Sequence, residues 1–347
     1  MANPADEWSS ADLKALTAGG LITEDVMAKI WDISRIPLPF TDIIGTDSHK
    51  NAYAEWTQDS LAAPDITNAV VDGADAVATD AAGGGRVGNH SQISQKAVSV
   101  TQRAQHSAVI GRANELSYQV MMRQQECKRD IEAIMLTQQA SIADSGTSTP
   151  GKSGGFSSWL ETNTSNGATG SDGGFNTSTK VVDAADGGNI RAFTEVMLKA
   201  SVLKAYNANG NVTHIMSTPE LIQKLNTFLL SSSANIATPT ANVTGTSPVK
   251  QVAQGAVNVY ATDFNTVLII EPNRLQVNIT GNEADVFYID PTKVAISFLE
   301  GMNVKPLAKV GLADKRQMSA DWTLKVYDEA AHAIDRGIDD SAAVTAS

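Results

Sequence analysis

The residues Gly146–Ser153, GTSTPGKS, match the Walker A pattern G-x-x-x-x-G-K-[ST], whose backbone cradles nucleotide phosphates. Such a loop needs a buried strand before it and a helix after it, so that N–H groups and the helix N-terminus converge on the phosphates. Here residues 136–144 continue an amphipathic helical pattern, and Gly154-Gly155 disfavour an emerging helix by about 1 kcal/mol per residue. We therefore interpret the match as a mobile Gly/Ser hinge, with nucleotide binding as the weaker alternative, and expect Lys152 to be replaceable.

Other residue types that could carry chemistry form no recognisable constellation. The five histidines sit beside no recognisable nucleophile motif. The single Cys127 excludes an intrachain disulfide and a cysteine-based zinc cluster. Asp47 with His49, or Asp183 with Asp186, could contact a metal ion, but the spacing of a calcium loop is absent, so solvated acidic loops are favoured. We therefore predict no enzymatic activity, no cofactor and no metal site.

The composition narrows the function classes further. The 347 residues include 26 Lys and Arg against 38 Asp and Glu, a net charge of −12, which argues against a dedicated nucleic-acid reader with a basic face. No apolar run approaches the roughly 20 residues needed to span a bilayer. The first residues, MANPADEWSS, lack the basic and apolar regions of a secretion signal. We therefore expect no contact with a membrane and no secretion.

The clearest predicted element is a long helix over residues 104–142. Its length would be on the order of 50 Å at about 1.5 Å per residue, so it must bridge substructures. Apolar residues recur there at spacings of three, four or seven, with Arg, Gln and Glu between them. This apolar stripe consists of Val109, Ala113, Leu116, Val120, Cys127, Ile131 and Ile134.

The segments before this helix predict an N-terminal arm and an extended hairpin. Ile36–Phe40 holds two prolines and cannot be helix interior. Tyr53–Gln58 and Gln92–Val100 resemble strands, and the interval between them is rich in Ala, Asp and Gly. Because an isolated two-stranded hairpin is marginal in water, we expect it to find partners elsewhere on the fold or on another molecule.

The segments after the helix predict a polar connection, an α/β region and closing strands. The tract Asp144–Asn189 is typical of a flexible connection, with one anchored patch at Phe156–Leu160. Ser217-Thr-Pro-Glu220 has the spacing of a helix-capping box. The predicted elements are helices over 190–206 and 219–230, strands over 212–216, 257–261 and 267–271, and closing strands through 294–298 and 322–326.

This order of elements resembles the major capsid proteins of tailed bacteriophages, with a Hong-Kong-97-like fold, of the kind found in short-tailed phages. The resemblance covers roughly residues 30–335. Each short matching sequence is weak evidence alone, whereas their order and spacing together are fairly specific. One departure is Asn265, where glycine is expected; a turn survives because Asn tolerates positive φ. The matching phrases are Glu55-Trp-Thr-Gln-Asp-Ser-Leu61, Gln92-Ile-Ser-Gln95, Glu126-Cys-Lys-Arg-Asp-Ile-Glu132, Tyr260-Ala-Thr-Asp-Phe264, Pro272-Asn-Arg274, Leu307-Ala-Lys-Val-Gly311 and Trp322-Thr-Leu-Lys-Val326.

The resemblance implies an α+β fold with an arm, an extended loop, a peripheral domain built on a spine helix, and an α/β axial domain. The implied divisions are an N-terminal arm (1–45), an extended β-hairpin loop (46–100), a first peripheral part with the spine helix and flexible connection (101–184), an axial domain (185–285), a second peripheral part of closing strands (286–335) and a C-terminal tail (336–347).

It also implies a structural protein that self-assembles into hexamers and pentamers of an icosahedral head around phage double-stranded DNA. An encapsulin-like cargo shell is the alternative with the same fold. Residues 46–100 would reach over a neighbouring subunit, although Trp56 could equally pack within its own chain. The candidate intersubunit contacts are Glu55, Trp56, Asp59, Arg86, Lys128 and Arg129.

The implied partners are copies of this chain, a portal, scaffolding proteins and decoration proteins. Packaged DNA would be contacted only non-specifically, because a basic lumen would bind phosphates and obstruct packing. The implied location is the virion capsid, with assembly in the host cytoplasm.

Overall fold

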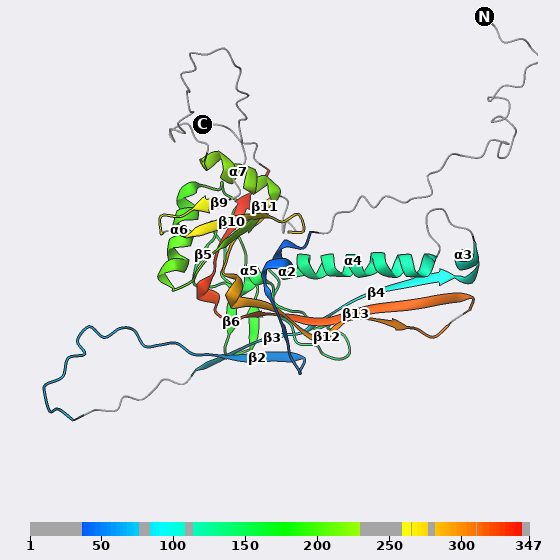
Figure 1. Cartoon of the computed structure of the whole chain (residues 1–347), viewed down its shortest axis with the longest axis horizontal. Coiled ribbons are helices and arrows are strands. Elements are labelled where there is room, and N and C mark those ends of the chain that lie inside the picture. The colour runs from blue at the N-terminus through cyan, green and yellow to red at the C-terminus, as the bar shows by residue number, and fades with distance from the viewer. Residues whose placement is uncertain are drawn as a thin grey trace, which may run out of the picture.

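Two β-sheets organise the chain, one beneath the long helix and one in an α/β lobe beside it (Figure 1). A hairpin projects from the junction of the two on the side away from the long helix. The fold thus combines helices and sheets in separate regions, as an α+β class requires. The computed structural model describes residues 37–75, 84–107, 114–229, 259–264, 266–276, 282–309 and 311–341.

The first sheet has four strands in the order β1-β12-β13-β4, and the long helix α4 lies across it. Trp322, Leu324 and Val326 alternate with polar residues, and all three bury the same face of β13 against α4 and its neighbours. The closing strands predicted from alternation are confirmed, since Val294 pairs with Val326. The elements are β1 (Gly45–Ser48), β4 (Gln92–Thr101), α3 (Gln102–His106), α4 (Glu115–Met135), η1 (Pro291–Lys293), β12 (Val294–Pro306) and β13 (Ala313–Val326).

The predicted spine helix is shorter than 104–142. Asn114 caps α4, because its side chain accepts a hydrogen bond from the backbone N–H of Ser117 at 2.9 Å. The helix ends at Met135, and the following residues run into a bridge between Ile142 and Lys152. The polar tract after it is therefore packed and not a free continuation of the helix.

The second sheet has six strands in the order β5-β14-β11-β8-β10-β9. Tyr288 and Ile215 point into a core that α6 and α7 cover, whereas Phe287 and Met216 face the core shared with the first sheet. The elements are α5 (Phe156–Trp159), β5 (Thr164–Ser165), β6 (Gly174–Asn176), β7 (Val181–Asp183), α6 (Glu195–Asn207), β8 (His214–Ser217), α7 (Pro219–Leu229), β9 (Val259–Ala261), β10 (Val267–Pro272), β11 (Glu283–Ile289), η2 (Glu329–Ala331) and β14 (Ala333–Asp339).

Two of the predicted limits fall inside strands, the limit after residue 285 in β11 and the limit after residue 335 in β14. These strands pair with each other in the six-stranded sheet, so residues 286–289 and 333–339 lie in the α/β lobe. The predicted flexible connection over 144–189 contains the fully buried helix α5 and the small β6–β7 sheet. The anchored patch Phe156–Leu160 is confirmed, because all five residues are buried.

The hairpin is built from β2 (Tyr53–Gln58) and β3 (Gly85–His90), not from Tyr53–Gln58 and Gln92–Val100 as predicted. The segment assigned to the return strand is β4, which pairs with β13 in the four-stranded sheet. The chain therefore passes directly from the hairpin into the sheet that supports α4. A movement of the hairpin base is coupled to that sheet through this continuity.

A buried carboxylate joins three distant segments. Glu132 on α4 accepts hydrogen bonds from the backbone N–H groups of Phe40 and Thr41 at 2.7 and 2.9 Å, and from the Thr41 hydroxyl. It also accepts one from the Asn273 side chain at 3.0 Å. The first two donors are the free N–H groups at the start of α2 (Pro39–Ile43), so Glu132 caps a helix from outside it. This side chain holds the start of α2 and the residue after β10 against α4.

We expect Glu132→Ala to lower the free energy of unfolding by about 3 kcal/mol or more, because it leaves two buried and two half-buried donors without their acceptor. The midpoint of urea unfolding of the unassembled chain measures this. The matched control is Glu126→Ala on the same helix, where a half-exposed pair with Arg123 contributes less than about 1 kcal/mol. Equal losses in the two variants would contradict the role of Glu132.

Candidate intersubunit contact surfaces

The structure divides the six candidate contact residues into internal and open ones. Trp56 is internal: its ring lies 5.4 Å from that of Trp159 and 6.4 Å from that of Tyr327, and it packs against the core. Within one copy Trp56 therefore packs against its own chain, and its contact with a neighbouring subunit stays a prediction. Glu55 and Arg86 face each other across the hairpin at 3.0 Å and are both exposed to solvent, so they are accessible but already paired.

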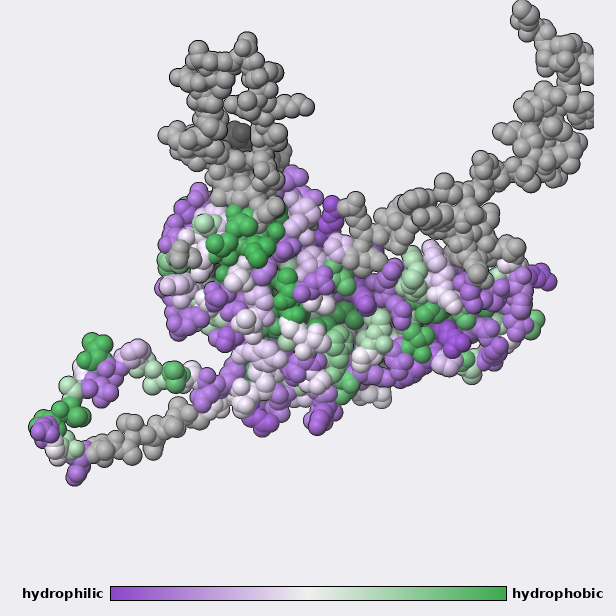
Figure 2. All heavy atoms as spheres, viewed as in Figure 1, coloured by the Kyte–Doolittle hydropathy of each residue, from purple (hydrophilic) through white to green (hydrophobic). Residues whose placement is uncertain are grey.

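The open part of the hairpin is loop 59–75, which begins at the candidate residue Asp59. Every residue from 59 to 75 is exposed, and the loop projects away from the body (Figures 1 and 2). Leu61 and Ile66 are 99% and 98% exposed, and Val70 and Val71 are also exposed. Monomeric proteins rarely leave such apolar side chains together in water. Sequence analysis missed these residues, although the apolar residues between aspartates were visible.

The two basic candidates on α4 lie in different surroundings. Lys128 is exposed, whereas Arg129 is half-buried and its Nε is covered without a hydrogen-bond partner among the described residues. Asp130 beside it forms an ion pair with Lys96 at 2.6 Å. The hydrogen bond that Lys96 donates to Asp130 raises the pKa of Lys96. Arg129 is thus the candidate whose guanidinium is half-buried and still able to bind a group from outside the chain.

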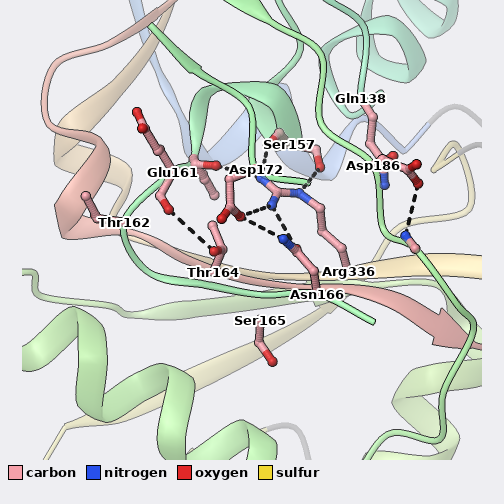
Figure 3. Close-up of polar contacts among 12 residues, drawn as sticks. Gln138, Ser157, Glu161, Thr162, Thr164, Ser165, Asn166, Asp172, Asp186 and Arg336 are labelled. Carbon is pink, nitrogen blue, oxygen red and sulfur yellow. Dashed lines mark hydrogen bonds and ion pairs between the residues drawn. The ribbon is translucent and has the colours of Figure 1, made fainter. Parts of the chain in front are cut away.

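A second buried polar cluster holds the α/β lobe, and sequence analysis missed it. Arg336 on β14 is fully buried, and its five N–H groups all find acceptors. The guanidinium lies between Asn166 and Asp172 on one side and α5 on the other (Figure 3). The acceptors are the Ser157 hydroxyl and carbonyl, the Leu160 carbonyl, Asn166 at 3.0 Å and Asp172 at 3.2 Å.

Asp285 on β11 completes this cluster. It accepts hydrogen bonds from Ser157 at 2.9 Å and from the Gln138 amide at 3.2 Å. Burial raises the pKa of Asp285, and the charge of Arg336 opposes that shift. Burial likewise lowers the pKa of Arg336, opposed by Asp285 and Asp172. Ser157 and Gln138 come from the segment after α4, so the cluster ties that segment to the sheet of the α/β lobe.

The Walker-like segment is exposed over residues 146–150, but its last residue, Ser153, and the two glycines that follow are buried, which corrects the expected hinge at this end. Ser153 is buried, and its hydroxyl accepts hydrogen bonds from Asn89 and from the backbone of Leu324. A methyl group on Gly155 would run into the backbone carbonyl of Thr137. The two glycines after Ser153 therefore serve close chain packing and leave no phosphate cradle.

The same residues, Gly151–Gly155, also fit the nucleophile pattern G-x-S-x-G, which sequence analysis overlooked. A nucleophile elbow needs an exposed serine hydroxyl beside a histidine base. Ser153 is 1% exposed, and its hydroxyl is engaged by the Asn89 amide and the Leu324 N–H. This serine is therefore structural.

The acidic residues considered for metal binding have other partners. Asp47 forms an ion pair with Lys325 at 2.6 Å, and this hydrogen bond lowers the pKa of Asp47. Asp183 accepts from Asn176, and Asp186 from the backbone of Gly188. Within the described ranges no three His, Cys, Asp or Glu side chains are grouped to hold a metal ion. Nor is any helix of that part long and apolar enough to cross a membrane.

We expect Gly155→Ala to destabilise the chain by more than about 2 kcal/mol, because its methyl group overlaps backbone that cannot move without disturbing the core. Lys152→Ala, three positions earlier and exposed, is the matched control and changes stability by less than about 0.5 kcal/mol. Thermal unfolding of both variants measures the difference. A tolerated Gly155→Ala would mean that the segment is loose after all.

The buried side chain of His332 makes the free energy of unfolding depend on pH. Burial lowers the pKa of His332 from 6.5 to about 4. Between pH 6.5 and pH 4, His332 is therefore protonated in the unfolded chain but neutral in the folded chain. The free energy of unfolding is at its full value above pH 6.5 and decreases as the pH falls toward 4, by about 3 kcal/mol in total. Burial raises the pKa values of Asp285 and Asp335, which acts in the opposite direction.

His332→Asn isolates this contribution, because asparagine does not titrate and its oxygen can still accept the hydrogen bond that the Asp290 backbone donates. We expect the variant to lose less stability than the parent between pH 6.5 and 4. Urea midpoints across that range measure it. Parallel curves for the two proteins would show that His332 titrates normally.

The family model of the SU10 major capsid protein matches residues 10–339. A curated relative, the major capsid protein of Escherichia phage Phieco32, is 36% identical over 102 residues, which span 29% of this chain and 29% of the relative.

Solved structures share the fold at low sequence identity. The capsid of a native GTA particle matches with a TM-score of 0.57 and 12% identity, covering 95% of this chain and 99% of the other. The SrpI encapsulin of Synechococcus elongatus matches with a TM-score of 0.53 and 9% identity, covering 91% and 95%. At these identities the matches establish the fold.

Proposed function

The chain belongs to the SU10 major capsid protein family, and from this premise we propose that it is the building block of a phage head, assembling into hexamers and pentamers of an icosahedral shell around double-stranded DNA. The single observation that carries the proposal is the family match over residues 10–339. The projecting loop 59–75 supports it, because four exposed apolar side chains need a partner outside the chain.

The proposal assigns each region a mechanical role. The four-stranded sheet with α4 carries load along the shell, and the lobe with the six-stranded sheet surrounds the capsomer axes. The hairpin reaches a neighbouring copy, where Asp59 and the exposed pair of Glu55 and Arg86 are contact candidates; Lys128 and Arg129 are candidates on α4. Several moderate interfaces per subunit add up to a stable lattice while each remains reversible.

Further partners follow from a head of this kind. We propose a portal, scaffolding proteins and decoration proteins as protein partners, and packaged DNA as a non-specific one. The net charge of −12 supports weak DNA contact, since released counterions would otherwise drive tight binding. The chain would act in the virion after assembly in the host cytoplasm, with no catalytic role.

Electron microscopy of the purified chain tests assembly directly. Shells, tubes or capsomers are expected, and a chain that stays monomeric at all concentrations would refute the proposal. DNA inside native particles distinguishes a phage head from an encapsulin-like cargo shell, which is favoured as the alternative by the shared fold of the Synechococcus encapsulin. Protein cargo without DNA would support that alternative.

We expect Ile66→Ser to raise the critical concentration for assembly at least about tenfold. Burying an isoleucine contributes about 1.5–3 kcal/mol, and 1.4 kcal/mol is a factor of ten. Light scattering against protein concentration measures the threshold. Ala69→Ser in the same exposed loop is the matched control and leaves the threshold within about twofold. An unchanged threshold for Ile66→Ser would exclude the loop from the interface.

A further inference from the structure

A cavity lies at the base of the hairpin, on the face of the four-stranded sheet that points away from α4. Ile93 on β4 and Asp321 on β13 are direct partners across these strands, so their side chains lie on the same face. Trp322, the next residue on β13, is buried in the core beneath α4, so Asp321 points to the other side. Tyr53 and His90, which pair at the base of the hairpin, form a second wall of the cavity.

The third wall is the loop that carries the Walker-like sequence. A bridge between Ile142 and Lys152 closes this loop, and Pro150 and Gly151 line the cavity. Gly151 packs so closely on the hairpin base that a methyl group there would come within 2.9 Å of the Ser91 carbonyl oxygen. The cavity measures about 470 Å³, which lies in the range of pockets that hold small ligands. The Walker-like segment thus helps to form a pocket, although not a phosphate cradle.

The charges on the walls disfavour an anion and favour a cation. Asp144 and Asp321 both line the cavity, and the described residues around it include no Lys or Arg. Asp321 forms no ion pair with a described residue, and its Oδ1 is enclosed without a hydrogen-bond partner among them. Asp144 uses one carboxylate oxygen to accept from the backbone N–H of Gly146 at 2.9 Å. Burial lowers the pKa of His90, so its ring is uncharged at pH 7.

The remaining walls suit an apolar stem attached to the cation. The ring of Tyr53 lies 4.6 Å from that of His90, and the side chain of Ile93 is 63% exposed beside them. An aromatic face next to carboxylates binds an ammonium group through cation–π attraction and charge-assisted hydrogen bonds. The Tyr53 hydroxyl is also enclosed without a partner among the described residues, and it can accept one more hydrogen bond. An enclosed acceptor without a donor is unfavourable, so these oxygens call for N–H groups from outside the chain.

We propose that this cavity binds a small organic cation, a primary ammonium group on a short aliphatic chain. The ammonium donates to the carboxylates of Asp321 and Asp144, and the aliphatic chain covers the ring of Tyr53 and the side chain of Ile93. The site goes beyond the proposed function, because every wall belongs to one copy of the chain. A bound ligand would join the base of the hairpin to β13 and to the loop that follows α4.

Titration of the unassembled chain with n-butylammonium at pH 7 tests the site, with saturation-transfer NMR as the measurement. We expect saturable binding with a Kd on the order of 1 mM, a modest affinity for a ligand of a few non-hydrogen atoms. The matched probes are n-butanol and butyrate, which keep an aliphatic chain but lack the positive charge, and we expect both to bind at least about tenfold more weakly. Equal binding of the three probes, or saturable binding of inorganic phosphate in place of n-butylammonium, would overturn the proposal.

Two isosteric variants test the location. We expect Asp321→Asn and Asp144→Asn each to weaken the binding of n-butylammonium at least about tenfold, because each removes one negative charge beside the ammonium. Two variants are used so that a folding defect in one does not decide the result, and urea midpoints check both. Asp314→Asn is the matched control, because Asp314 lies on the same strand and pairs with Lys309 outside the cavity. Parent-like binding in both cavity variants, or an equal loss in the control, would contradict the assignment.

The same titration on assembled particles distinguishes a free ligand from a lysine side chain of another chain. A free ligand predicts that n-butylammonium binds in particles as it does in the unassembled chain. Loss of the site on assembly would mean that a neighbouring chain fills the cavity, and it would overturn the assignment to a small free cation. A chain that never assembles would refute the proposed function and leave the titration of the unassembled chain as the test of this site.

Discussion

The buried carboxylate of Glu132 is the contact on which the rest of the arrangement depends. It joins α4 to the start of α2 and to the segment after β10. Thr41 and Asn273, which donate to Glu132, lie 91 and 141 residues from it in sequence. Because a carboxylate accepts from several donors in fixed directions, this joint sets angles as well as distances. It also sets the positions of two arginines, because Arg129 lies one turn before Glu132 and Arg274 follows Asn273 directly.

Arg336 supplies the second joint, which ties α5 and the segment after α4 to the six-stranded sheet. Its guanidinium binds α5 and the loop around Asp172, while Asp285 reaches the segment that leaves α4. A protein with apolar side chains in place of such a cluster can be equally stable. Apolar contacts, however, allow several relative positions of the packed segments, whereas hydrogen bonds to a planar guanidinium select one. A shell built from many copies requires that each copy present its contacts at the same angle.

Much of the fold follows from local patterns, and the exceptions share one cause. β2, α7 and β10 lie within two residues of their predicted limits, because alternation and capping are local signals. β3, Gly85–His90, holds two glycines and no alternation, and Arg336 looks like a tail residue because a charge normally indicates solvent. Both owe their places to partners more than 25 residues away. The Walker-like match was rejected on context, but the close packing of Gly154 and Gly155 directly after it was missed, since close chain approach leaves no trace in sequence.

The surface differs from the interior in how its side chains are paired. Inside, the carboxylate of Glu132 and the guanidinium of Arg336 each bind several partners; outside, loop 59–75 leaves apolar side chains and aspartates in water. Such a segment contributes little to the stability of one copy; under the proposed function, its exposed apolar side chains become favourable when another copy covers them. Exposed charges are screened within about 10 Å at 0.1 M salt, and each apolar contact contributes a few kcal/mol at most, so a misplaced copy can leave again. Rigid polar joints within the subunit and weak mixed contacts between subunits together allow a lattice to form with few errors.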